Sequence, residues 1–199
     1  MPKYKKEFEK KLLYVSGENE NSLIKDNISK ISECSNYYKN FDYSNFYSVN
    51  HKIAENVIDK NLNIIVGEGL GAFCIMLLSN ENIPDGHNIL SRLIINPIIK
   101  PTEYLRDAGC SVKVVDTYLM SEKSVLKQAY LDVRHSFCIF SKDNETAMKY
   151  YDEFKNECPL KHIVVDTINK EFIENDLKQY INILLSGKEI NIINKYESE

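Results

Sequence analysis

The sequence predicts an α/β fold, a single-domain three-layer sandwich in which helices cover both faces of a mostly parallel sheet. Short β-branched runs alternate with amphipathic helical segments along the chain, which is the pattern of a buried parallel sheet. The 199 residues are 43% hydrophobic and 27% charged, enough for one substantial core. Residues 63–78 read NIIVGEGLGAFCIMLL and predict a strand, a glycine-rich corner and a buried helix. This stretch lies at the centre of the expected fold.

The first part of the chain is expected to supply one strand and two helices before the glycine corner. An apolar run at 12–15 predicts a strand, and Ser16-Gly17 ends it. Apolar residues recur at helical spacing in 21–32 and again from Val49. Between these helices, 36–49 is rich in Tyr and Phe. It indicates either an exposed recognition surface or an edge strand with a covering loop, and we favour the loop.

The second part continues the alternation of strands and helices. Strands are expected at 89–96, 136–140 and 162–165, and a strand or extended connector at 112–119. Helices are expected at 122–131, 144–157 and 172–185. The domain is therefore placed at 1–185, with a loosely attached tail at 186–199. Ligands are expected at the carboxyl ends of the parallel strands.

Charge and composition argue against several classes of partner. The net charge of −4 speaks against nucleic acid, because phosphate binding needs a clustered positive field. The apolar run near the N-terminus is too short for a signal peptide, and no run approaches the roughly 20 apolar residues of a membrane span. We therefore expect a cytoplasmic protein without a membrane partner. The abundance of Asn, Lys and Ile hints at a phage or a low-GC bacterium.

Cysteine and histidine usage predicts reduced thiols, no metal site and no cofactor. The five cysteines are an odd number without a C-x-x-C pair. No HxH or HExxH motif occurs, and GEGLG matches neither a P-loop nor the spacing of a dinucleotide fingerprint. Cys74 is interpreted as a core residue of the apolar helix. Surface positions are expected for the four histidines, His51, His87, His135 and His162.

The glycine corner has the form of a nucleophile elbow without a nucleophile. A strand, a Gly-x-x-x-Gly corner and a buried helix make this elbow, whose central residue must be Ser, Cys or Asp. Here the central residue is Gly69. Because glycine offers no side-chain atom that can attack a carbonyl, the corner predicts the fold more firmly than it predicts an activity.

The order of motifs resembles the small bacterial α/β-hydrolase-like esterases of the YqiA/YcfP type. In those proteins a Gly-x-x-Leu-Gly elbow is followed by an Ile-Asn-Pro strand end, as in LIINPIIKPTEYL at 93–105. The segments CIFSKDNETAMKYYDEF and HIVVDTINKEF are similar to those that carry the family's catalytic acid and histidine. The resemblance covers most of 12–185. It implies an α/β-hydrolase-like fold and, in an intact member, action on small acyl esters.

Carried over by position, the resemblance implies a degenerate catalytic triad. Gly69 stands at the serine position, Asp143 at the acid position and Lys170 at the histidine position. A lysine with its ordinary pKa near 10.4 is protonated at neutral pH and is a poor base. Asp143 is interpreted either as the retained acid or as a helix cap. An Asp143–Lys170 ion pair is a further expectation.

The resemblance also indicates a pocket around the elbow. The family's His-Gly pair after the first strand is Ser16-Gly17 here. Backbone N–H groups of Leu70 and of Gly17-Glu18 are expected to point into the pocket, as an oxyanion site does. The expected pocket residues are Ser16, Gly17, Glu18, Glu68 and Leu70.

These features favour a catalytically degenerate α/β-hydrolase-fold protein, a pseudo-esterase that binds a small acyl or carboxylate ligand or a protein partner. Enzymatic activity is not expected, because the nucleophile and the histidine are both missing. A weak or non-standard carboxylic-ester hydrolase is the alternative. A further alternative is an interaction or assembly subunit whose contact surface is the Tyr-rich segment 36–47.

Overall fold

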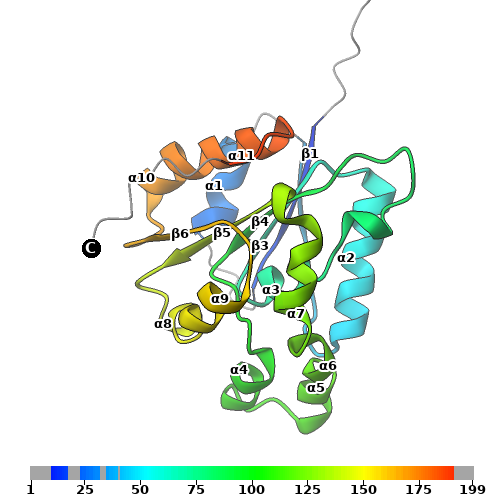
Figure 1. Ribbon diagram of the computed structural model, residues 1–199, viewed down its shortest axis with the longest axis vertical. Helices are drawn as coiled ribbons and strands as arrows, with labels where there is room; N and C mark the ends of the chain where they lie inside the picture. Colours follow the sequence, from blue (N-terminus) through cyan, green and yellow to red (C-terminus); the bar gives the residue numbers. More distant parts are fainter. Residues whose placement is uncertain (1–9, 18–22, 32–34, 40, 191–199) are drawn as a thin grey trace, which may run out of the picture.

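A parallel sheet with helices on both faces forms the centre of the molecule. The computed structural model describes residues 10–17, 23–31, 35–39 and 41–190. These residues form a six-stranded sheet of order β2-β1-β3-β4-β5-β6, in which every neighbouring pair is parallel (Figure 1). The strands are β1 Lys11–Val15, β2 Ser35–Lys39, β3 Ile64–Glu68, β4 Ser91–Ile95, β5 Ser136–Ser141 and β6 His162–Val165. The predicted fold class is confirmed.

Helices connect the strands and cover both faces of the sheet. In Figure 1, α1, α10 and α11 lie over one face, and α2, α3, α7 and α9 lie over the other. The helices are α1 Leu23–Ile31, α2 Phe46–Lys60, α3 Leu70–Met76, α4 Pro101–Asp107, α5 Val112–Asp116, α6 Leu119–Glu122, α7 Val125–Gln128, α8 Glu145–Met148, α9 Tyr151–Glu157, α10 Lys170–Phe172 and α11 Lys178–Leu185. No helix in these ranges is both apolar enough and long enough to cross a bilayer.

Two hydrophobic clusters correspond to the two faces of the sheet. Successive strand residues point to opposite faces, so Leu13 packs with α2 and α3 whereas Leu12 packs with α1 and α11. Ile190 is 3% exposed and belongs to the second cluster, so packing continues five residues beyond α11. The described chain therefore has a core on each side of β3, the strand that leads to the elbow.

Two predicted elements differ from the structure. The segment 36–49 contains the edge strand β2, as the favoured interpretation expected, but α2 begins at Phe46 rather than at Val49, because Asn45 caps it by accepting from Ser48 N at 3.0 Å. The expected strand or connector at 112–119 is instead the helix α5. Its β-branched residues suggested a strand, yet Val115 is buried while Val112 is 75% exposed, which is the one-sided burial of a surface helix.

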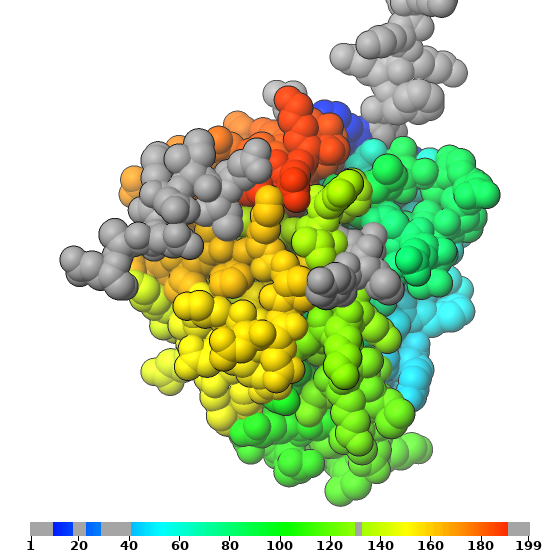
Figure 2. All heavy atoms as spheres, viewed as in Figure 1, coloured from blue at the N-terminus to red at the C-terminus, as the bar shows by residue number. Residues whose placement is uncertain are grey.

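Three predicted helices are interrupted. The segment 122–131 contains α7 and part of the 3-10 helix Ala129–His135. The segment 144–157 divides into α8 and α9. The closing helix contains the π-helical stretch Ile173–Leu177 between α10 and α11. Figure 2 shows α8 and α9 in yellow above the green α4–α6 region. The layers match the prediction, whereas the helix ends do not.

A buried arginine holds the far end of the elbow helix. Arg92 on β4 is 1% exposed. Its Nε donates to Ser136 Oγ at 2.8 Å, and its Nη1 donates to the carbonyls of Leu78 and, at 3.4 Å, of Ile75 and Met76. The guanidinium thus donates to carbonyls at and just beyond the C-terminus of α3, where the helix supplies few donors of its own. The apolar pattern of the sequence predicts the strand here but does not predict that Arg92 is buried in it.

Candidate functional site

The glycine corner folds as a sharp elbow between β3 and α3. Gly69 has φ 59° and ψ −121°, a backbone conformation that residues with a Cβ rarely adopt. Its N–H donates to Ile95 O at 3.1 Å, and its carbonyl accepts from Phe73 N at 3.2 Å and Ile98 N at 3.3 Å. These bonds fix position 69 at the carboxyl edge of the sheet, where α3 begins.

The two flanking glycines let the elbow helix approach the sheet closely. A Cβ at Gly67 would lie 2.9 Å from the backbone N of Ala72, and a Cβ at Gly71 would lie 2.5 Å from Val15 O. Real Cβ atoms do not approach backbone atoms this closely, so both positions require glycine. The Gly-x-x-x-Gly pattern therefore reflects contact between α3 and the strands β1 and β3.

Position 69 differs from its neighbours because it has room for a side chain. A Cβ at Gly69 would lie 3.6 Å from Gly17 Cα and 3.8 Å from Ile98 Cδ1, which are ordinary van der Waals contacts. The loop after β1 thus lies directly against the elbow, as expected for Gly17. The corner has the shape and the space for a nucleophile but carries no reactive atom.

Asp143, at the predicted acid position, lies just after β5 and is held by a hydroxyl. Thr167, in the loop after β6, donates from Oγ1 to Asp143 Oδ2 at 2.5 Å. Hydrogen bonds from Thr167 and then Ser141 lower the pKa of the Asp143 carboxyl from its ordinary value. The interpretation of Asp143 as a helix cap is wrong, because the side chain of Asn144 caps α8 by accepting from Ala147 N at 2.9 Å.

Lys170, at the predicted histidine position, does not reach the acid. Its side chain is 72% exposed, and Nζ lies 3.6 Å from Oε1 of Glu174. The expected Asp143–Lys170 ion pair is absent from the described residues, so that expectation is wrong. The physical reason is that Lys170 starts α10, where Glu174 lies one helical turn away, while Thr167 already contacts the carboxylate.

Asn96 links the end of β4 to the end of β5, the strand that precedes Asp143. It ends β4 with φ 45°, and its buried Oδ1 accepts from Ser141 N at 2.8 Å while Nδ2 donates to Ser141 Oγ at 3.1 Å. Asparagine tolerates this left-handed conformation, and the following Pro97 cannot extend the strand. The Asn-Pro motif quoted above therefore has a structural role: it fixes the carboxyl ends of β4 and β5.

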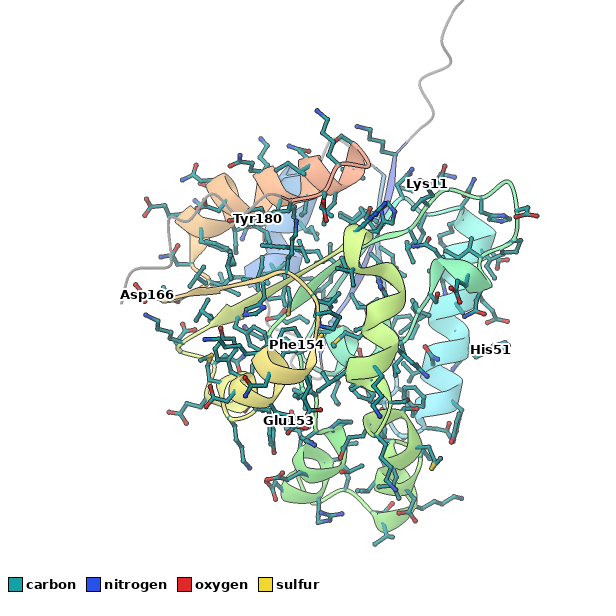
Figure 3. All side chains as sticks on the ribbon, viewed as in Figure 1. Lys11, His51, Glu153, Phe154, Asp166 and Tyr180 are labelled. Atoms are coloured by element: carbon teal, nitrogen blue, oxygen red, sulfur yellow. The ribbon has the colours of Figure 1, made fainter. Side chains whose placement is uncertain are left out.

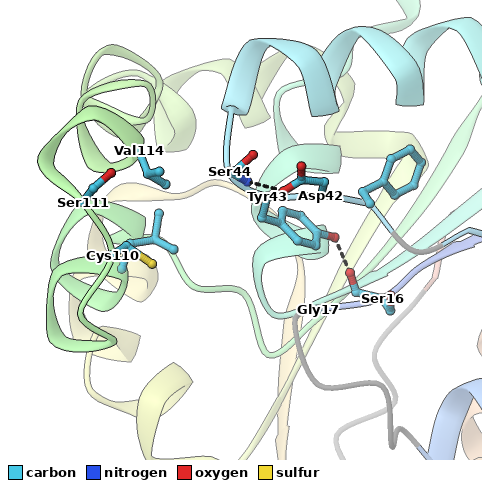
Figure 4. A pocket seen from close by; sticks show the side chains of 10 residues that line it. Ser16, Gly17, Asp42, Tyr43, Ser44, Cys110, Ser111 and Val114 are labelled. Atoms are coloured by element: carbon cyan, nitrogen blue, oxygen red, sulfur yellow. Dashed lines mark hydrogen bonds between the residues drawn. The ribbon is translucent and has the colours of Figure 1, made fainter.

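A cavity of about 440 Å³ opens beside the elbow. Figure 4 shows it between the loop after β1, the segment 41–44 and the region of α4 and α5. Tyr43 donates its hydroxyl to the carbonyl of Ser16, and Tyr118 donates its hydroxyl to the carbonyl of Tyr43 at 2.8 Å. Both tyrosine side chains are buried, so these bonds fix 41–44 as one wall of the cavity.

Only some of the predicted pocket residues line this cavity. Ser16 and Gly17 line it. Glu68 and Leu70 do not: Glu68 Oε2 accepts from Tyr14 OH at 2.6 Å, and Leu70 is completely buried. Glu18 lies outside the described residues. The remaining walls come from two segments that lie far apart in the sequence, and no motif predicts that they meet. Their lining residues include Asp42, Ser44, Leu105, Cys110, Ser111 and Val114.

Solved structures of hydrolases resemble most of the chain. Est1E from Butyrivibrio proteoclasticus superimposes with a TM-score of 0.63 at 13% identity, over 94% of this chain and 92% of that protein. An alpha-beta hydrolase from Vibrio vulnificus superimposes with a TM-score of 0.51 at 13% identity, over 89% of this chain and 73% of that protein. The chain has the α/β-hydrolase fold. S-formylglutathione hydrolase from Staphylococcus aureus superimposes with a TM-score of 0.55 at 12% identity, over 89% of this chain and 81% of that protein. No protein-family model and no curated protein matches the sequence.

The α/β-hydrolase fold here contains no imidazole beside its cavity. None of the four histidines, all of which are described, lines it. His51 lies on the outer side of α2, 3.5 Å from Glu55 (Figure 3), and His162 lies 3.2 Å from the Tyr151 hydroxyl. A hydroxyl or thiol nucleophile in this fold needs a base to remove its proton, and no histidine is placed to do so.

One cavity residue with nucleophilic chemistry has no counterpart among the predicted site residues. Cys110, half-buried just after α4, lines the cavity with its neighbour Ser111. Cys74, by contrast, is completely buried, and burial raises the pKa of its thiol. The core interpretation of Cys74 is confirmed. No local sequence pattern identifies Cys110 as a cavity residue, because its position depends on how the segment after β4 folds.

Proposed function

We propose that this protein is a pseudo-esterase, a catalytically degenerate α/β-hydrolase-fold protein that binds a small ligand in the cavity beside its elbow. The observation that carries this proposal is Gly69. The elbow keeps its backbone conformation, its tight packing and the space above position 69, while the reactive side chain is missing. A descent from small esterases of the YqiA/YcfP type accounts for the order of the motifs and belongs to the same proposal.

The second catalytic loop supports the same interpretation. Asp143 is present but accepts a hydrogen bond from the Thr167 hydroxyl, and Lys170 pairs with Glu174. A threonine hydroxyl is not a base at neutral pH, and the Lys170 side chain points away from Asp143 to Glu174. The nucleophile and the base of a triad are therefore both missing. A single displaced residue would not replace both.

The cavity supports a small molecule rather than a protein as the ligand. Its volume of about 440 Å³ falls in the range of small-molecule sites. Within 41–47, Phe41, Tyr43 and Phe46 are buried and Tyr47 is 58% exposed. The aromatic residues described there serve mainly as core and cavity wall, so the proposal of a Tyr-rich contact surface receives little support. The fold's chemistry leads us to expect an acyl or carboxylate compound as the ligand.

A weak or non-standard carboxylic-ester hydrolase is the second candidate, and Cys110 is the observation in its favour. A free thiol that lines the cavity has the chemistry of a displaced nucleophile. The absence of a histidine from the lining argues against efficient turnover.

Hydrolysis of a short-chain nitrophenyl ester series tests both candidates. We expect the purified protein to show no turnover above that of a matched Cys110→Ala variant. Thermal unfolding with short acyl amides, alcohols and acids is the companion measurement, and a shift with at least one of them is expected. Turnover that survives purification and disappears in Cys110→Ala would replace the pseudo-esterase with the hydrolase. A flat thermal response to all compounds would remove the ligand-binding part of the proposal.

A further inference from the structure

We infer that the cavity selects small amines with an apolar body and disfavours carboxylates, and that Asp42 makes this selection. The inference rests on the proposed ligand-binding function and replaces the acyl or carboxylate compound expected there with an amine. It follows from the charge, the hydrogen-bonding groups and the apolar walls of the cavity.

Asp42 supplies the charge of the cavity. Among the described residues that line it, Asp42 is the charged one, and the others are Ser, Gly, Tyr, Phe, Leu, Cys and Val. Asp42 is exposed, so its carboxylate lies at the mouth of the cavity in contact with water. The nearby cation Lys52 on α2 is the last in order of size among the causes that lower the pKa of Asp42, and it does not line the cavity. A carboxylate ligand would therefore meet a like charge with no lining cation to compensate it.

The carboxylate of Asp42 is oriented by the turn that contains it. Ser44 N donates to Asp42 Oδ1 at 2.9 Å, which fixes the side chain at the start of the turn before α2 (Figure 4). The backbone and side chain of Ser44 lower the pKa of the Asp42 carboxyl, so the group is ionised at neutral pH. An ionised carboxylate has about four acceptor sites, so it can bind an ammonium group while keeping its bond to Ser44.

The inner wall accommodates the apolar body of such a ligand. Phe41, Tyr43 and Leu105 are buried side chains that line the cavity, and Val114 adds a half-buried one. The aromatic rings also favour a cation at close range. A primary amine on a short aromatic or aliphatic body thus matches the apolar wall and the anionic mouth together.

Three probes of one shape separate charge from fit: benzylamine, benzyl alcohol and benzoate. We would measure their dissociation constants by NMR titration at low salt. Benzylamine is expected to bind about fivefold more tightly than benzyl alcohol and benzoate about fivefold more weakly, the factor for one charge pair about 4 Å apart in a water-like dielectric. The differences should shrink at about 0.5 M NaCl, because exposed charges are screened.

Asp42→Asn is the matched variant, since the amide oxygen can still accept from Ser44 N. This variant should bring the dissociation constants of the three probes close together, and the dissociation constant of benzyl alcohol should not change. Asp85→Asn, an exposed charge in the loop before β4, is the control and should leave the order intact. An unchanged order in Asp42→Asn, or an equal loss in Asp85→Asn, would overturn the role of Asp42. Benzoate binding as tightly as benzylamine would overturn the selectivity alone, whereas no binding by any probe would overturn the proposed function as well.

Discussion

The Thr167 hydroxyl donates a 2.5 Å hydrogen bond to Oδ2 of Asp143, so the loop after β6 meets the acid three residues before Lys170. An imidazole at 167 is therefore better placed to use this acid than an imidazole at 170. We expect Gly69→Ser with Thr167→His to hydrolyse nitrophenyl acetate about 100-fold faster than Gly69→Ser alone, the usual contribution of a general base. Gly69→Ser with Lys170→His is the control and should stay close to the single variant. Greater activity in this control would show that the histidine position is 170 after all.

Gly71→Ala should destabilise the protein although it replaces glycine by alanine within a helix. Such a change normally stabilises a helix by about 1 kcal/mol. Here the new Cβ would lie 2.5 Å from Val15 O, so we expect a loss of about 3 kcal/mol in the free energy of unfolding. Urea denaturation measures the loss. Gly86→Ala, with φ 88° and open space around it, reports backbone strain alone and should cost about 1 kcal/mol.

Arg92→Met should destabilise the protein without changing ligand binding. The substitution keeps most of the side chain's volume but leaves the buried Ser136 hydroxyl and the carbonyl of Leu78 without their donor. We expect a loss of about 2–4 kcal/mol in denaturant unfolding. Arg106→Met, at an exposed site on α4, is the control and should be nearly neutral. A small effect of Arg92→Met would mean that α3 does not depend on this capping.

Thr167→Val should raise the pKa of the Asp143 carboxyl toward its ordinary value. The hydroxyl of Thr167 is the largest cause of the lowering, and valine keeps the shape without the donor. Because the folded-state pKa is lowered, the stabilisation is present above the unfolded pKa near 3.9 and is lost as pH falls through the folded value. Carboxyl NMR titration checks the shift, with the exposed Thr146→Val as control. An unchanged pKa in Thr167→Val would leave Ser141 as the main cause.

Cys110 should be the first of the four described cysteines to react with iodoacetamide at pH 8. It is half-buried at the cavity, whereas burial raises the pKa values of Cys74 and Cys138 and raises that of Cys158 to about 11. Mass spectrometry of peptides after timed labelling gives the order. Benzylamine in the cavity should slow the labelling of Cys110. Faster labelling of Cys158 would show that the core around β5 opens more readily than the cavity.

The sequence was sufficient for the layers and for the elbow, because periodicity and glycine spacing depend on local chemistry. Residues 63–78 gave the strand, the corner and the helix in the right order, and the parallel sheet followed from the alternation. The helix α5 was missed because Val112, Val114 and Val115 have the composition of a strand. Tertiary packing of Val115 and Tyr118 overrides that preference.

The candidate site was predictable only where it coincides with a motif. Ser16 and Gly17 directly follow a predicted strand, so topology alone places them beside the elbow. Asp42 and Cys110 reach the same cavity from segments about 70 residues apart, and no local pattern relates them. Thr167 was missed for a similar reason: the sequence locates the loop after β6 but does not determine which of its side chains turns toward Asp143.

The empty corner at Gly69 also limits how this chain can change over generations. With φ 59°, a residue that bears a Cβ would store roughly 1–3 kcal/mol of strain there, and glycine stores none. That is a large share of the roughly 5–15 kcal/mol by which a domain stays folded. A mutation that introduced serine at 69 would weaken folding at once and would supply no catalysis until a base also arrived beside Asp143. Selection for stable folding alone is thus enough to keep a serine out of this corner.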